Sequence, residues 1–359
     1  MTDVTEPKSG IRWGIAGPAI ALLFLVAAYT VYWFIVTDEI RKQVEAFAAN
    51  PPHGLVTGWS DFSMRGYPYR IAADFRHPSL AAPAAPEQWE WRSDRATVAL
   101  LPYNLRHAML TFGHEHAISY RDVRNGSANG IRATVEKAQA SYVDLRDLPV
   151  GRIAIDVNGL DARHSRAGRD TERLRATRLQ LHARPALTEE EELIPAAYDF
   201  ALRTEEVEVE GMRRLPVLGN NIAHLLMQAR LRAVPGTPHV SAVELLDAWR
   251  DSGGTLAISD LIVKWGPLDL TANGELALDR RNRPEGRLDA RVKDFKGLLD
   301  ALERDGFVKE EEARLALAGL TLVSQFQGNR SDEILVPVIM REGRLYLGPL
   351  AVAELEPLY

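Results

Sequence analysis

Alternating apolar and polar positions run through most of the chain beyond Leu55. Leu268, Leu270 and Ala272 alternate with polar residues, and past Gly274 the apolar positions keep the same parity. Because successive side chains of a strand point to opposite faces, this pattern predicts strands with one buried and one solvated face. It recurs in several other short segments: Ile71–Phe75, Ala96–Leu100, Ile131–Val135, Ile153–Val157, Leu179–Leu181, Tyr198–Leu202 and Val207–Val209.

Helical spacing is concentrated in the second half of the chain. The leucine-rich segment Leu215–Ala233 has apolar residues on one broad face and predicts a helix. Ser241–Glu244 resembles a capping box that opens a short helix ended by Gly253 and Gly254. Two further short helices are predicted over Phe295–Leu302 and Lys309–Leu317. The fold class is therefore α+β and β-rich, with long antiparallel, curved sheets and a few packing helices.

One long apolar run precedes these segments. Trp13–Val36 contains 24 residues without a formal charge, and aromatic residues lie at both of its ends. As a helix it is about 36 Å long, against roughly 30 Å of bilayer hydrocarbon. A cleaved signal peptide has an apolar core of only about 7–15 residues, and a buried core helix is seldom apolar on all sides. An uncleaved, single-span membrane anchor is the prediction.

The residues around the anchor set the expected organisation of the chain. Residues 1–12 form an N-terminal tail, 13–36 the transmembrane helix, and 37–52 a helical stalk that ends at Pro51 and Pro52. Residues 53–187 are expected to form a β-rich region and 188–359 an α+β region. The boundary between these two regions precedes the acidic run Glu189–Glu192, which we expect to be a solvated loop.

Charges on the two sides of the anchor are balanced, so the positive-inside rule does not decide its orientation. A short tail before the span and the whole body after it is the usual arrangement of a signal anchor. On that basis we expect the protein in the inner membrane, with its bulk in the periplasm if the source is a Gram-negative bacterium.

Composition excludes several classes of function. The formal net charge of −6 and the scattered arginines argue against a nucleic-acid-binding protein. The chain has no cysteine, which excludes disulfides, cysteine-ligated zinc, iron–sulfur clusters and a thiol nucleophile. It has no phosphate-binding glycine loop and no HExxH or GxSxG motif. We therefore expect a non-enzymatic protein without a cofactor.

A pair of histidines is the one arrangement with metal-binding spacing. His114 and His116 lie on one face of a predicted strand, and His107 is the nearest candidate for a third ligand. An ordinary polar strand face explains the same residues, and no metal site is predicted.

Aromatic residues gather in the stretch Gly58–Ile71, shortly after the anchor. Pro68 cannot donate to a β-ladder and Gly66 suits a bulge, so the stretch predicts a strand, a kink and a second strand. Its aromatic residues either pack the end of a sheet or contact lipid headgroups, a ligand or a protein partner. The candidate contact residues are Trp59, Tyr67, Tyr69, Arg70 and, further along the chain, Trp265.

The segment Gly66–Arg70 resembles the G-[FY]-P-[FY]-R signature of an uncharacterised family of membrane-anchored proteobacterial envelope proteins, a domain of unknown function. Trp265–Leu268, Gly274–Asp279, Pro284–Gly286 and Gly343–Pro349 are similar to that family too. The resemblance implies an envelope location and this overall plan, and it carries no chemistry. The architecture alone also resembles that of the AsmA-like envelope proteins, which are linked with lipid transport.

Two functional hypotheses follow. In the first, the curved sheet binds or handles lipid or another hydrophobic ligand beside the membrane. In the second, the protein is an envelope scaffold that binds another protein through a sheet edge and has no ligand. Apolar parity does not separate them, because a filled core and an open groove give the same alternation.

Overall fold

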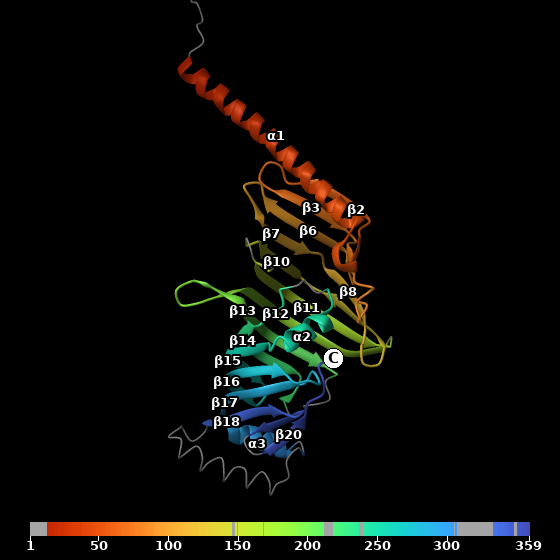
Figure 1. The fold of residues 1–359 in the computed structure, drawn as a ribbon, viewed down its shortest axis with the longest axis vertical. Coiled ribbons are helices and arrows are strands. Elements are labelled where there is room, and N and C mark those ends of the chain that lie inside the picture. Colours follow the sequence, from red (N-terminus) through yellow and green to blue (C-terminus); the bar gives the residue numbers. More distant parts are fainter. Residues whose placement is uncertain are drawn as a thin grey trace, which may run out of the picture.

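The fold is dominated by one antiparallel β-sheet with a long helix projecting from one end (Figure 1). The computed structural model describes residues 13–145, 148, 150–167, 169–211, 218–236, 240–304, 306, 333–347 and 350–359. Its helices are α1 (Trp13–Ala49), α2 (Ala242–Asp251) and α3 (Phe295–Arg304), with one 3₁₀ turn, η1 (Pro52–Gly54). The β-rich class and the curved antiparallel sheet predicted from the sequence are confirmed.

The strands follow one another through the rest of the chain. They are β1 (Val56–Gly58), β2 (Asp61–Arg65), β3 (Ile71–Arg76), β4 (Ser79–Ala81), β5 (Glu90–Ser93), β6 (Arg95–Leu101), β7 (Asn104–Phe112), β8 (Glu115–Arg121), β9 (Ala128–Thr134), β10 (Lys137–Val143), β11 (Arg152–Arg166), β12 (Arg169–Leu187), β13 (Leu193–Glu210), β14 (Asn221–Arg232), β15 (Thr255–Trp265), β16 (Leu268–Leu278), β17 (Pro284–Lys293), β18 (Glu333–Arg341), β19 (Arg344–Leu347) and β20 (Leu350–Glu354).

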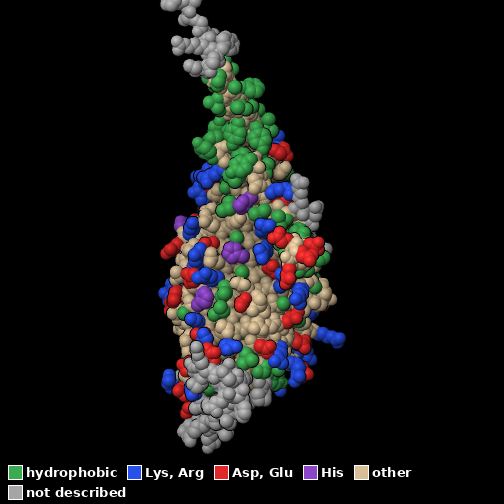
Figure 2. All heavy atoms as spheres, turned by 90° about the vertical axis from the view of Figure 1, so that its left-hand side faces the viewer, with side chains coloured by type: hydrophobic (Ala, Val, Ile, Leu, Met, Phe, Trp, Pro, Cys, Tyr) green, Lys and Arg blue, Asp and Glu red, His purple; other side chains and the backbone are tan. Residues whose placement is uncertain are grey.

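Helix α1 has two parts that differ in what surrounds them. Its N-terminal part is long and apolar enough to cross a membrane, and its side chains there are exposed. Figure 2 shows these apolar side chains gathered on the helix, whereas charged side chains spread over the body. Beyond Trp33, buried and half-buried residues recur every three or four positions, so one face of the helix packs on the sheet. The predicted stalk is the continuation of the same helix, which ends before Pro51.

The sheet is a meander. From β11 to β20 each strand pairs with the next one in the chain. The first ten strands are halves of longer strands that bend in the middle. One set of halves pairs in the order β2, β3, β6, β7, β10, and the other in the order β1, β4, β5, β8, β9. The two sets meet on β11, which pairs with β10 along its first half and with β9 along its second.

We call the line of bends the crease. It crosses the sheet through Trp59–Ser60, His77–Pro78, Asp94, Gly113–His114, Val135–Glu136 and Gly159. Gly159 has a φ of 60°, and a Cβ there would collide with the side chain of Glu136. Most of these strands have one extra residue at the crease, which shifts the alternation of side chains by one position. The apolar residues therefore lie on the same face of the sheet before and after the bend. Phe112 before the crease contacts Trp91 and His116 beyond it, so the apolar face is the inner face of the bend.

Two short helices are fastened to the sheet. The side chain of Ser241 accepts a hydrogen bond from the amide of Glu244 and so caps α2 as predicted. Figure 1 shows α2 lying in front of the strands, and the Trp249 indole donates to the carbonyl of Arg232 at the end of β14 (2.8 Å). Helix α3 begins at Phe295 as predicted. The helix predicted over Lys309–Leu317 lies outside the described residues.

One predicted helix is wrong. Residues 221–232 of the predicted helix Leu215–Ala233 form strand β14, which is hydrogen-bonded to β13 on one side and to β15 on the other. Leu225, Met227 and Ala229 face the inside of the sheet, and the two residues between them, Leu226 and Gln228, face outward. The additional leucine at position 226 produced the helix-like spacing. The segment is nevertheless a strand, because its backbone pairs with β13 on one side and with β15 on the other.

The acidic run Glu189–Glu192 forms the exposed turn between β12 and β13, which agrees with the predicted solvated loop. The predicted regional boundary at Leu187 and Thr188 coincides with this turn. Strands β12 and β13 pair along most of their length, so hydrogen bonding continues from one predicted region into the other.

Candidate functional site

The segment Gly66–Arg70 forms the turn between β2 and β3, and this turn docks on α1. The Trp33 indole donates to the carbonyl of Arg70 (3.2 Å), and the Tyr29 hydroxyl donates to the carbonyl of Pro68. The Tyr67 ring meets the Trp33 ring edge-to-face, with centroids 5.4 Å apart. Trp33 is only 4% exposed. Trp33, one of the aromatic residues at the C-terminal end of the predicted span, therefore packs against protein.

The other candidate contact residues separate into three places. Tyr69 and Arg70 are exposed in the turn itself. Trp59 lies at the crease and packs with Phe62 and Phe75, at centroid distances of 5.7 and 5.3 Å. Trp265 lies at the end of β15, where its indole donates to the carbonyl of Gly219 (2.9 Å) and its side chain packs against the apolar cluster of Leu218 and Ala301. The structure therefore groups Tyr67, Tyr69 and Arg70 beside α1 and leaves Trp265 many strands away.

An uninterrupted row of apolar residues crosses the inner face of the sheet. We call it the apolar row. It takes one residue from each of β2, β3, β6, β7 and β10–β18, and each member is directly opposite the next: Met64, Ala73, Val98, Leu110, Ala140, Ile155, Leu181, Leu202, Met227, Leu261, Ala272, Ala290 and Val336. With strands about 4.8 Å apart, it extends on the order of 60 Å from the membrane end.

Burial varies along the apolar row. Ala73 is buried at the membrane end, and Ala272 and Ala290 are buried at the far end within the main apolar cluster. Between them, every member from Val98 to Leu261 is only half-buried. The middle of the apolar row thus presents large aliphatic side chains that the described protein covers incompletely.

The neighbouring row, one residue along each strand, points outward and is mostly polar. We call it the polar row: Ser63, Asp74, Thr97, Thr111, Gln139, Asp156, Gln180, Arg203, Leu226, Ile262, Thr271, Arg291 and Leu335. The outer face also carries ion pairs such as Arg178–Asp156 (2.8 Å). The difference between the rows separates an apolar surface from a solvated one.

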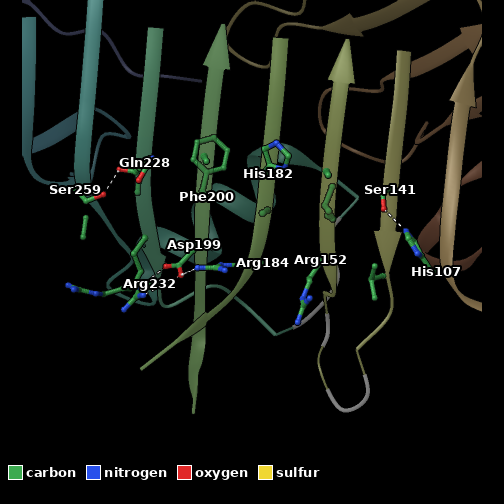
Figure 3. Close-up of a pocket in the computed structure, with 18 residues that line it drawn as sticks. His107, Ser141, Arg152, His182, Arg184, Asp199, Phe200, Gln228, Arg232 and Ser259 are labelled. Atoms are coloured by element: carbon green, nitrogen blue, oxygen red, sulfur yellow. Dashed lines mark hydrogen bonds and ion pairs between the residues drawn. The ribbon is translucent and has the colours of Figure 1, made fainter. Parts of the chain in front are cut away.

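A hollow of about 840 Å³ lies among long polar side chains over β7 and β10–β15. Figure 3 shows Arg184 and Asp199 directed toward one another on neighbouring strands, and Arg230 closes on the same carboxylate at 2.7 Å. The negative charge of Asp199 therefore partly neutralises the positive charges of Arg184 and Arg230. The hollow is open, and its lining mixes these charged side chains with apolar residues such as Ile153 and Phe200.

Asp74 is the most buried charge of the polar row, at 5% exposure. Its carboxylate accepts hydrogen bonds from Arg95 (2.6 Å), Thr97 (2.6 Å) and Arg65 (2.9 Å). The bonds from Arg95 hold the pKa of this carboxyl below its ordinary value, and Thr97 and Arg65 add to them against the opposing effect of burial. Asp74 therefore binds three strands together and is a structural group.

The histidines of the predicted pair point to carbonyl oxygens. A ring nitrogen of His114 lies 3.0 Å from the carbonyl oxygen of Val135, and one of His116 lies 3.2 Å from that of Gly113. Burial lowers the pKa of His116, which favours its neutral form. His107 is bonded to Ser141 (2.8 Å). Within the described residues, no three histidine or acidic side chains come together as a metal-binding group.

Residues 33–356 match a family described as an uncharacterized protein conserved in bacteria, DUF2125. The chain belongs to this family. The match begins within α1 and covers the whole sheet, so the crease and both rows lie inside the family region. No curated protein and no solved structure matches the chain. The description of DUF2125 gives conservation in bacteria and no chemistry.

Sequence reasoning missed two features of this site. The apolar row depends on strand pairing, which the alternation alone does not specify. The docking of Tyr67 on α1 joins segments more than thirty residues apart, and its only signal was the aromatic cluster on each side, Tyr29–Trp33 and Tyr67–Tyr69.

Proposed function

We propose that the protein is a membrane-anchored, non-enzymatic envelope protein that holds lipid or another hydrophobic ligand against the apolar row. Its helix α1 lies in the inner membrane and its sheet lies in the periplasm. The observation that carries the proposal is the incomplete cover of the row between Val98 and Leu261.

The physical reason is the cost of exposed apolar surface. Each Å² of apolar surface removed from water contributes roughly 25 cal/mol, so a long chain lying along several half-buried leucines gains substantially. An acyl chain matches this surface, because it is long, unbranched and apolar, as a ligand lying along the extended apolar row has to be. The row also lacks the convergent polar groups of a site for a polar ligand. The row also begins at β2, next to α1 and the bilayer.

Site-specific photocrosslinking tests the proposal in intact membranes. A photoreactive amino acid replaces Leu181 or Leu202 in the apolar row, and the matched controls replace His182 or Arg203, the next residues on the same strands and the opposite face. The inner positions are expected to yield lipid adducts by mass spectrometry and the outer positions none. Equal yields at inner and outer positions would overturn the proposal.

The same experiment addresses the alternative of a scaffold without a ligand. A scaffold that covers its inner face with a partner would give a protein adduct of defined mass at Leu181 and Leu202. The proposal requires lipid adducts there, and reproducible protein adducts in their place would favour the scaffold.

A further inference from the structure

Two turns of the sheet are bonded to α1 at nearly the same level. The β2–β3 turn accepts the hydrogen bonds of Tyr29 and Trp33 described above. The β6–β7 turn is held in the same way, because the Tyr32 hydroxyl donates to the carbonyl of Pro102 (2.8 Å). Pro102 is fully buried, whereas Tyr103 beside it projects outward. One short stretch of the helix thus fixes both turns.

That stretch lies near the C-terminal end of the apolar part of α1, which continues to Val36. From Trp13 to Tyr32 a helix rises about 30 Å, which equals the thickness of the bilayer hydrocarbon. Tyrosines 29 and 32 then lie in the headgroup layer, the usual position of membrane tyrosines. Because the two turns are bonded at this level, they reach the same layer.

The side chains at the tips of the two turns suit that layer. Tyr69 and Tyr103 are each 83% exposed, and outside α1 no other large apolar side chain of the described residues exceeds 56%. Leu105, Arg70 and Arg106 are also exposed beside them. Tyrosine pairs an apolar ring with a polar tip, and arginine binds phosphate, so the set matches the glycerol and phosphate region of a bilayer.

We propose that Tyr69, Arg70, Tyr103, Leu105 and Arg106 form a second membrane contact, the membrane foot, which inserts into the headgroup layer of the bilayer that holds α1. The contact is continuous with the anchor, since Tyr29 and Tyr32 bond directly to the turns that carry it. A single helix leaves the body free to rotate about its axis and to tilt. The membrane foot adds two points beside the helix and holds the membrane end of the apolar row against the bilayer.

The membrane foot can be tested with spin labels, because the chain has no cysteine of its own. Full-length Tyr69→Cys and Tyr103→Cys variants are labelled in phospholipid bilayers, and collisions with oxygen are compared with collisions with a water-soluble nickel complex. The matched control is Val123→Cys, in the β8–β9 turn away from α1, where the native side chain is 39% exposed. The ratio of oxygen to nickel collisions is expected to be several-fold higher at 69 and 103 than at 123.

Two outcomes would overturn the inference. Labels at 69 and 103 that meet the nickel complex as freely as the label at 123 would place the turns in water. Labels shielded from both reagents would place them under protein. Circular dichroism of each variant confirms the native sheet before labelling. The measurement does not involve the apolar row, so its failure is distinguishable from failure of the proposed lipid binding.

Discussion

The apolar row and the polar row are built from the same strands and differ by one residue along each. The apolar row is uninterrupted from β2 to β18. The polar row contains charged, amide and hydroxyl side chains, and it remains mostly polar although it includes Leu226, Ile262 and Leu335. The comparison shows that the inner face carries no polar residue along this line, whereas the outer face carries both kinds. Only the inner face therefore presents a continuous apolar surface.

A charge in the apolar row is expected to have the largest effect. Ala290 is 1% exposed within the main apolar cluster, so Ala290→Asp buries an unpaired carboxylate at a cost of about 3–5 kcal/mol in the free energy of unfolding. The control Asp289→Ala, on the outer face of the same strand, removes an exposed pair with Arg287 and costs less than about 1 kcal/mol. Thermal unfolding in detergent, followed by circular dichroism, measures both. Equal losses would contradict the distinction between the faces.

Asp74 is the most buried charged residue of the polar row. Asp74→Ala leaves Arg95 and Arg65 without their shared carboxylate and is expected to cost about 2–3 kcal/mol. The cost is below that of a fully buried pair because both arginines are half-exposed. Thr97→Val, which removes only one of the bonds, is expected to cost about 1 kcal/mol. Chemical denaturation provides the comparison, and a loss for Asp74→Ala no larger than that for Thr97→Val would contradict it.

The same carboxylate predicts a dependence on pH. The folded pKa of Asp74 is depressed, chiefly by its hydrogen bonds to Arg95, relative to an unfolded value of about 3.9. Its contribution to stability is therefore fully present above the unfolded pKa and is lost as the pH falls through the folded pKa. Below about pH 4 the difference in melting temperature between the native protein and Asp74→Asn should narrow. A constant difference down to the lowest accessible pH would exclude this linkage.

The smallest effect is expected in the middle of the apolar row. Leu202 is half-buried, so Leu202→Ala should cost about 1–2 kcal/mol, less than a typical fully buried leucine. Arg203→Ala on the outer face should change stability by about 0.5 kcal/mol or less. Melting curves of delipidated protein measure the pair. A cost for Leu202→Ala near 4 kcal/mol would mean that this stretch is closed core.

Much of the fold was accessible from the sequence because its main signal is local. Alternation identified strands such as Ile153–Val157 and Leu268–Leu278, and the capping serine identified the start of α2. The helix predicted over Leu215–Ala233 failed because pairing with β13 and β15 outweighs local spacing. A single leucine on the outer face, Leu226, was enough to mislead the pattern.

The candidate site was accessible only in part. The sequence predicted apolar faces and an aromatic turn, and it named Tyr67, Tyr69 and Arg70 together. It gave no means to see that Tyr103 lies in a turn held at the same level of α1, because that proximity depends on the order β2, β3, β6, β7. It also grouped Trp265 with residues that the meander places far from it.

The crease has a consequence for how proteins of this design change in size. Most of the bent strands carry one extra residue at the crease, so the bend of the sheet is determined separately in each of these strands. Inserting another bent hairpin would lengthen the sheet by two strand widths and leave the bend at the crease unchanged. The number of hairpins thus sets how far the sheet extends from the bilayer, and this number can change without any change at the two ends of the sheet.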